Sequence, residues 1–150
     1  MELKLPPVIV FFGFGLLMFL LNMFLPFGFF DFFGRLVMVK ILAGVAMGML
    51  AITGIQFFKT KTTVDPRKPS KANKLITSGL YKFSRNPMYL AMLLLLLAWG
   101  LQLGNAFNTL LASGFVYYMN SFQIIPEEKM LATKFGKEYT RYLTKTRRWF

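Results

Sequence analysis

Two short clusters hold the polar residues whose types and spacing suit chemistry. The first cluster is Arg85, Asn86, Pro87 and Tyr89, between a basic stretch and a long uncharged one. Asparagine is favoured at a helix cap and proline at the position after it, so a helix is expected to begin here. Arg85 and Tyr89 are then one turn apart, beside the unpaired N–H groups of a helix N-terminus. Such a place suits a carboxylate or a phosphate, and an interfacial anchor that only sets helix depth is an equally weighted alternative.

The second cluster is the adjacent pair Glu127 and Glu128, just after Pro126. Acidic residues in the first turn of a helix are favoured by the helix dipole, and this is the simplest interpretation. The functional alternative is recognition of a cation, an ammonium group or ribose hydroxyls. A ligand that carries both a carboxylate and a positive amine would match Arg85 and the two glutamates together.

The composition excludes several kinds of chemistry and indicates a membrane. The 150 residues include no Cys and no His, which excludes disulfides, thiol nucleophiles, histidine bases and Cys/His metal sites, and no metal site is expected. Hydrophobic residues make up 55% of the chain and 18 residues are Phe, more than a small soluble domain can bury. The excess apolar surface therefore predicts contact with membrane lipids.

The uncharged runs predict an all-α bundle that forms a single membrane domain with about four transmembrane helices. Residues 86–126 carry no charge and are too many for one span, and Gly100, Gly104 and Asn105 mark the turn of a helical hairpin. The two apolar stretches that precede this hairpin, at about residues 6–30 and 36–58, are each long enough to cross a hydrocarbon core of roughly 30 Å. The four spans are expected at about residues 6–30, 36–58, 87–103 and 106–125.

Two basic regions set the expected orientation. One is a loop at residues 59–86 with eight basic residues, and the other is an amphipathic helix at residues 127–145. By the positive-inside rule both regions, and with them both termini, face the cytosol. The net charge of +12 is then explained by topology and anionic lipid, because most basic residues lie near span ends. We expect a multi-pass integral membrane protein that binds no nucleic acid.

The two clusters, in this order and spacing, resemble a known superfamily. It is the isoprenylcysteine carboxyl methyltransferase and phospholipid methyltransferase superfamily, whose members are integral membrane enzymes that use S-adenosylmethionine. The resemblance covers roughly residues 73–148, and the first two spans carry no recognised family signal. The matching residues are Gly79, Tyr81, Arg85, Asn86, Pro87 and Tyr89, followed by Glu127, Glu128, Leu131, Phe135, Gly136, Tyr139 and Tyr142.

The resemblance implies S-adenosyl-L-methionine as cofactor, bound at the cytosolic ends of the last helices. Tyr81, Arg85 and Tyr89 are the candidates for a catalytic role. Gln123 takes the place of an arginine that eukaryotic prenylcysteine members use for the substrate carboxylate, which makes it the candidate for substrate binding. Asn86 replaces the usual His of the family and removes a protonatable group. The residues implied for cofactor binding are Asn73, Lys74, Leu75, Ile76, Tyr81, Arg85, Asn86, Pro87, Met88, Tyr89, Glu127 and Glu128.

The sequence therefore predicts methyl transfer from S-adenosylmethionine to a membrane-embedded amphiphilic acceptor, either a carboxylate or a lipid-like amine. A carboxylate acceptor needs no general base, whereas a protonated amine needs one. One alternative is a non-catalytic membrane protein or assembly subunit that keeps the pocket and packs Gly44 and Gly48 against a partner helix. Another is a small transporter, which the absence of paired charges within the spans disfavours. The oligomeric state is left open.

Overall fold

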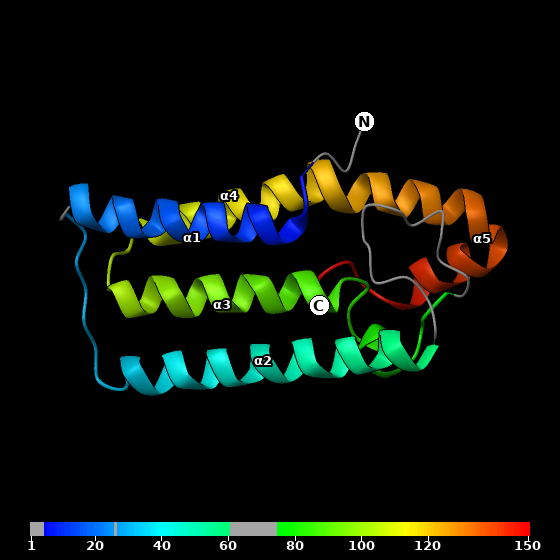
Figure 1. Cartoon of the computed structure of the whole chain (residues 1–150), viewed down its shortest axis with the longest axis horizontal. Helices are drawn as coiled ribbons and strands as arrows, with labels where there is room; N and C mark the ends of the chain where they lie inside the picture. Colours follow the sequence, from blue (N-terminus) through cyan, green and yellow to red (C-terminus); the bar gives the residue numbers. More distant parts are fainter. Residues whose placement is uncertain (1–4, 26, 61–74) are drawn as a thin grey trace.

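The computed structural model describes residues 5–25, 27–60 and 75–150, and in these ranges the chain is helical apart from loops and two isolated β-bridges (Figure 1). The all-α class predicted from the sequence is confirmed. Asn73 and Lys74 lie outside the described residues, as does much of the expected loop at 59–86. The helices are α1 (Pro7–Phe24), α2 (Arg35–Thr60), α3 (Pro87–Leu103), α4 (Asn108–Met119) and α5 (Ile125–Lys145), with a short 3-10 turn, η2 (Gly79–Lys82), and a π-helical turn, η3 (Asn120–Ile124).

The helix α3 is the centre of the bundle. It lies beside α2 on one side and beside α1 and α4 on the other (Figure 1). The side chains that meet there are apolar and fully buried, which is the packing that an uncharged run such as residues 86–126 can form on more than one face. Its core is made by Met18 of α1, Leu96 of α3, and Phe115 and Met119 at the end of α4.

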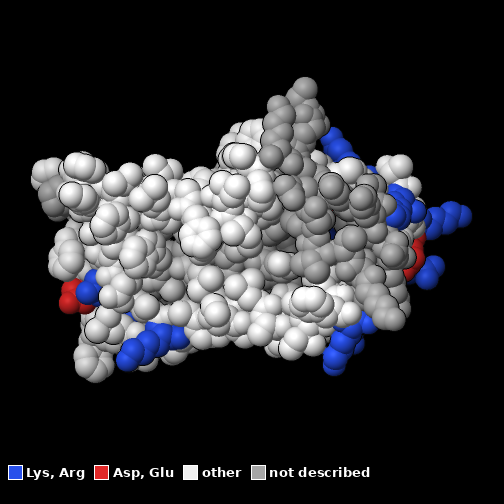
Figure 2. Space-filling model, viewed as in Figure 1, with Lys and Arg blue, Asp and Glu red and all other residues white. Residues whose placement is uncertain are grey.

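The outer surface of the bundle is apolar as well. Both α1 and α2 are long and apolar enough to cross a membrane by length and composition, and α3 is apolar but shorter. Large side chains on their outer faces, among them Phe12, Met47 and Ile55, are exposed in the isolated chain. Figure 2 shows charged side chains gathered toward the two ends of this face, with a broad uncharged surface between them. This distribution is typical of a membrane protein.

The chain reverses between α3 and α4 at Gly104 and Asn105, where a hairpin turn was expected. Gly104 has a φ of 71°, and a Cβ there would lie 2.2 Å from Arg35 Nη1, so glycine is required. Asn105 Nδ2 donates to the Leu25 carbonyl at 3.0 Å, and Phe30 N–H donates to the Gly104 carbonyl at 2.9 Å. The connection between α1 and α2 is therefore fastened to the hairpin turn.

The path after α4 differs from the sequence prediction. We expected one helix to end near residue 125 and another to begin at 127, but α4, η3 and α5 form one continuous helix through Pro126. Proline lacks an N–H and crowds the preceding turn, and the wider π-helical turn directly before it lets the helix continue. The break comes instead at Gly136, whose φ of 49° and ψ of −121° suit only glycine. The chain turns back there, so the expected helix at 127–145 is divided in two (Figure 1).

Candidate functional site

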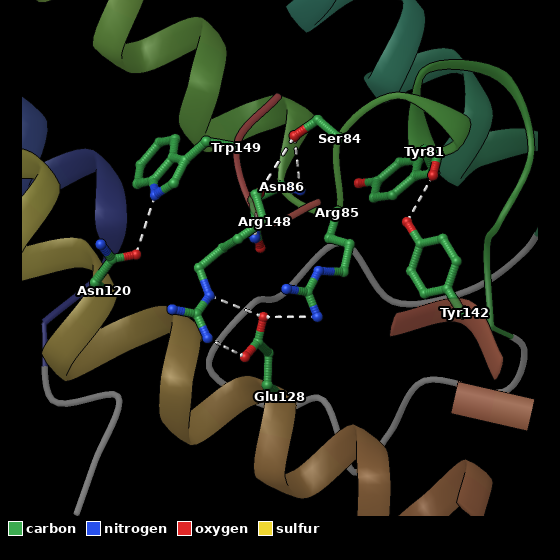
Figure 3. Close-up of polar contacts among 9 residues, drawn as sticks. All are labelled: Tyr81, Ser84, Arg85, Asn86, Asn120, Glu128, Tyr142, Arg148 and Trp149. Carbon is green, nitrogen blue, oxygen red and sulfur yellow. Dashed lines mark hydrogen bonds and ion pairs between the residues drawn. The ribbon is translucent and has the colours of Figure 1, made fainter. Parts of the chain in front are cut away.

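Glu128 lies at the centre of the polar end of the bundle (Figure 3). Its Oε1 is 3.4 Å from Arg85 Nη1 and accepts a hydrogen bond from Arg148 Nε at 3.1 Å, and its Oε2 accepts one from Arg148 Nη2 at 2.7 Å. The Glu128 and Arg85 side chains are only 17% and 14% exposed, so water and salt screen them weakly. The hydrogen bond to Glu128 raises the pKa of Arg148. Charge-assisted bonds thus join α5, the segment before α3 and the end of the chain.

The C-terminal segment, residues 146–150, is held against the stretch that precedes α3. Arg85 N–H donates to the Arg147 carbonyl at 2.9 Å, and Asn86 Nδ2 donates to the Arg148 carbonyl at 3.0 Å. Trp149 Nε1 donates to Asn120 Oδ1 at 3.1 Å and so reaches η3 (Figure 3). Three stretches that are distant in sequence are thereby fixed around Glu128: the one before α3, the η3–α5 helix and the C-terminal segment.

Glu127 faces α3 and meets Tyr89. The Tyr89 hydroxyl donates to Glu127 Oε2 at 3.0 Å, and Tyr89 itself is only 5% exposed. Burial raises the pKa of Glu127 to about 7, the charge of Glu128 acts in the same direction, and the Tyr89 hydrogen bond opposes both. Glu127 therefore exchanges between its neutral and charged forms near neutral pH, and a positive ligand would favour the charged form.

Tyr81 contacts both α2 and the part of α5 that follows Gly136. The Tyr142 hydroxyl donates to the Tyr81 carbonyl at 2.7 Å, and the Tyr81 ring meets Phe57 of α2 edge-on at 6.0 Å between ring centroids. Burial, with a smaller contribution from the charge of Glu127, raises the pKa of the Tyr81 phenol. The hydroxyl therefore stays protonated at neutral pH, which favours a role as hydrogen-bond donor over a role as base.

The turn before Tyr81 requires glycine. Gly79 has a φ of 61°, and a Cβ there would lie 1.9 Å from Gln56 Nε2. Gln56 reaches over from α2 and donates to the Ser78 carbonyl at 3.1 Å. The glycine thus lets α2 approach the turn and fixes the backbone from which Tyr81 extends.

Most of the expected site residues that the structure describes gather at this end of the bundle. The direct contacts are those of Arg85 with Glu128 and of Tyr89 with Glu127, each joining the first cluster to the second. Leu75 and Ile76 lie in the stretch just before η2, and Ile76 is buried. No group of three or more metal-binding side chains lies within the ranges that the structure describes.

Asn86, Met88 and Gln123 have contacts that the sequence did not predict, whereas Pro87 begins α3 as expected. Asn86 occupies the cap position of α3, but its side chain makes no cap hydrogen bond and holds the Arg148 carbonyl instead. Pro87 is buried at the start of α3, and Met88 packs against the apolar core. Gln123 is buried and donates through Nε2 to the Leu5 carbonyl, so it fastens η3 to the beginning of α1. Hydrogen bonds within the fold therefore occupy the side-chain nitrogens of both Asn86 and Gln123.

Arg148 is the main site residue that the sequence analysis missed. Its charge was counted only toward topology, as part of the basic C-terminal region. The available signal was its place beside Arg147 and Trp149, but nothing local distinguishes an arginine that is paired within the fold from one that is exposed to solvent. Its partner Glu128 is twenty residues earlier and is reached only because the chain turns back at Gly136.

Comparison with known proteins identifies the family. Residues 34–138, more than two thirds of the chain, match the phospholipid methyltransferase family. The chain belongs to this family. The match confirms the superfamily resemblance and extends it over α2, where the motifs gave no signal.

Two known proteins are similar in sequence to parts of this phospholipid methyltransferase family member. An uncharacterized protein of Haemophilus influenzae is 53% identical over 62 residues, which are 41% of this chain and 98% of that protein. A protein-S-isoprenylcysteine O-methyltransferase of Schizosaccharomyces pombe is 35% identical over 78 residues, which are 52% of this chain. The match spans 33% of the length of the Schizosaccharomyces pombe protein. No solved structure matches the chain significantly.

Removing the Arg148 side chain should destabilise the fold. Arg148→Ala leaves the partly buried Glu128 with one partner instead of two, and we expect the free energy of unfolding to fall by about 1–3 kcal/mol. Arg147→Ala is the matched control, because the Arg147 side chain is exposed and its residue joins the fold through the backbone. Thermal unfolding in detergent measures both variants. Equal melting temperatures for the two would contradict the assigned role of Arg148.

Glu127 should make the stability of the cofactor-free protein depend on pH. Its pKa is raised from 4.5 to about 7 on folding, so the folded state binds the proton more tightly than the unfolded state. The stabilisation is present below pH 4.5 and is lost as the pH rises through 7. We expect the melting temperature to fall between pH 5 and pH 8, where the chain has no His to titrate, and to stay flatter in Glu127→Gln. The same slope in both proteins would refute this prediction.

Proposed function

We propose that this chain is a membrane methyltransferase that transfers the methyl group of S-adenosylmethionine to an amphiphilic acceptor held in the membrane. Family membership supports the reaction class, and the observation that carries the proposal is the meeting of Arg85, Tyr89, Glu127 and Glu128 at one end of an apolar bundle. S-adenosylmethionine carries charges of both signs, and this cluster offers charged groups of both signs to bind them. The acceptor class, a carboxylate or a lipid-like amine, is part of the proposal.

The residues of this site fit the cofactor. S-adenosylmethionine carries a carboxylate, an ammonium group and ribose hydroxyls. Arg85 Nε is buried and has no hydrogen-bond partner in the part of the chain that the structure describes, so it can donate to the carboxylate. Glu127 can accept from the ammonium group or from a ribose hydroxyl, and a positive partner would favour its charged form.

The chain contributes positioning, exclusion of water and a place for a proton. When bound, the cofactor supplies a methyl group on a sulfonium with a neutral leaving group, so in-line placement is the main requirement. Arg85 and Glu127 orient the cofactor, and Tyr89 holds the Glu127 carboxyl in place. A carboxylate acceptor needs no base. An amine acceptor needs a base, and Glu127 is the better candidate than Tyr81, because the Tyr81 phenol stays protonated at neutral pH.

We propose that α1, α2, α3 and the α4–η3 helix cross the membrane, with the site and both termini on the cytosolic side. The contact of Gln123 with the Leu5 carbonyl supports this, because it puts the beginning of α1 at the same end of the bundle as α5. The end of α2, with Lys59, and the charged face of α5 lie at that end of the bundle, in keeping with the positive-inside rule.

The topology can be tested with single cysteines, because the natural chain has none. Phe33→Cys puts a thiol in the exposed connection between α1 and α2, and Lys137→Cys puts one on the exposed face of α5. In sealed right-side-out vesicles, a membrane-impermeant maleimide should label the thiol at 33 and leave the thiol at 137 unlabelled until detergent is added. Labelling of both thiols in intact vesicles, or of the thiol at 137 alone, would refute the topology.

The cofactor assignment can be tested by titrating the purified protein calorimetrically with S-adenosylmethionine. We expect Glu127→Gln to weaken binding by roughly tenfold or more, because a charge-assisted hydrogen bond to the cofactor is lost. Glu138→Gln is the matched control, since Glu138 lies exposed on the same helix. Absence of heat at millimolar cofactor would refute the proposed function, and unchanged affinity in Glu127→Gln would refute the role of that residue.

A non-catalytic protein that keeps the pocket is the alternative function. It predicts cofactor binding without turnover. Proteoliposomes of purified protein supplied with S-adenosylmethionine that carries a radioactive methyl group distinguish the two: label in the lipid extract supports the enzyme, and binding without transfer to the extracted lipids or to an added prenylcysteine supports the alternative.

A further inference from the structure

A mostly apolar pocket lies far from the charged cluster. It is a cavity of about 180 Å³ between α2, α3 and α4, near the hairpin turn. Along α3, its Gly100 is roughly 16 Å beyond Tyr89 at 1.5 Å per residue, so the cavity is separate from the candidate cofactor site. The lining is mostly apolar. It includes Phe30, Leu42, Leu96, Leu101, Gly100 and Asn108.

Asn108 is the unusual member of this lining. It is 2% exposed, and neither its Nδ2 nor its Oδ1 has a hydrogen-bond partner in the described part of the chain. Asn105, three residues earlier, is equally buried but uses both amide atoms, donating to the Leu25 carbonyl and accepting from Phe107 N–H. A buried amide without partners is costly, and more so where no lipid group can bond to it.

The fold holds Asn108 in this position. A Cβ added at Gly100 would lie 3.1 Å from the Asn108 Cβ, so the absence of a side chain at 100 lets α4 approach α3 this closely. Both residues line the cavity. The amide therefore lies at the wall of an apolar space with its donor group, Nδ2, and its acceptor, Oδ1, both free.

We propose that this cavity binds a small, neutral, mostly apolar molecule with one hydroxyl group. A hydroxyl both donates and accepts, so a single such group satisfies both atoms of the Asn108 amide. An engineered apolar cavity of about 150 Å³ accepts a benzene molecule, so the space here is large enough for a ring or a short alkyl chain. The lining of the cavity, as far as the structure describes it, includes no charged side chain, so a neutral ligand fits it better than an ionic one.

The proposal can be tested with octanol that carries a photoreactive diazirine, added to the purified full chain in lipid nanodiscs. We expect saturable labelling of peptides from the end of α3 and the start of α4, displaced by excess octanol and not by octane. Asn108→Leu should reduce this labelling at least tenfold. Ser113→Ala is the matched control, because Ser113 is exposed on the same helix and bonds only within it.

Three results would overturn the proposal. Labelling spread along the lipid-facing helices and unchanged in Asn108→Leu would mean that no site is formed. Displacement by octane as well as by octanol would mean that the hydroxyl is not recognised. If Asn108→Leu fails to fold, Leu97→Phe, which fills the same cavity and keeps the amide, replaces it, and unchanged labelling in that variant would mean that the cavity is not the site. Calorimetric binding of S-adenosylmethionine should be unchanged in Asn108→Leu, so this site and the proposed function fail separately.

Discussion

The polar end of this molecule depends on the bonds that Glu128 makes with two arginines. Arg85 precedes α3, Arg148 lies near the chain end and Glu128 begins α5, so one carboxylate joins three distant stretches. Its negative charge is held in place by these partners and also raises the pKa of its neighbour Glu127. The two adjacent glutamates therefore differ: Glu128 joins two arginines and maintains the structure, whereas Glu127 bonds to Tyr89 and is the one that we propose meets a ligand.

This arrangement requires an unusual helix path. The π-helical turn η3 carries the helix through Pro126, so the glutamates lie directly beyond the apolar part of α4 and over the start of α3. Gly136 then turns the chain back, which brings the C-terminal segment to Glu128 and to Asn120. A helix that simply stopped at residue 125 would not fix the glutamates so firmly relative to Tyr89.

Much of the site was predictable because its two clusters flank the same helical hairpin. Arg85 and Tyr89 precede or begin α3, the glutamates follow α4, and a hairpin brings those ends together. The roles of Asn86, Gln123 and Arg148 were not predictable, because each has a partner that only the tertiary path brings near. The continuity through Pro126 was missed for a similar reason: a proline after an uncharged run is the local pattern of a helix boundary, and no local pattern predicts a π-helical turn.

The proposal that Arg85 and Glu127 bind S-adenosylmethionine rests on their position in the polar cluster at the end of the bundle. An experimental structure of the full chain in lipid nanodiscs, determined with the cofactor at saturating concentration, tests it most directly. We expect density for the cofactor with its ammonium group or ribose hydroxyls within hydrogen-bond distance of Glu127 and its carboxylate at Arg85. Cofactor density elsewhere in the molecule, with Glu127 still bonded only to Tyr89, would contradict it.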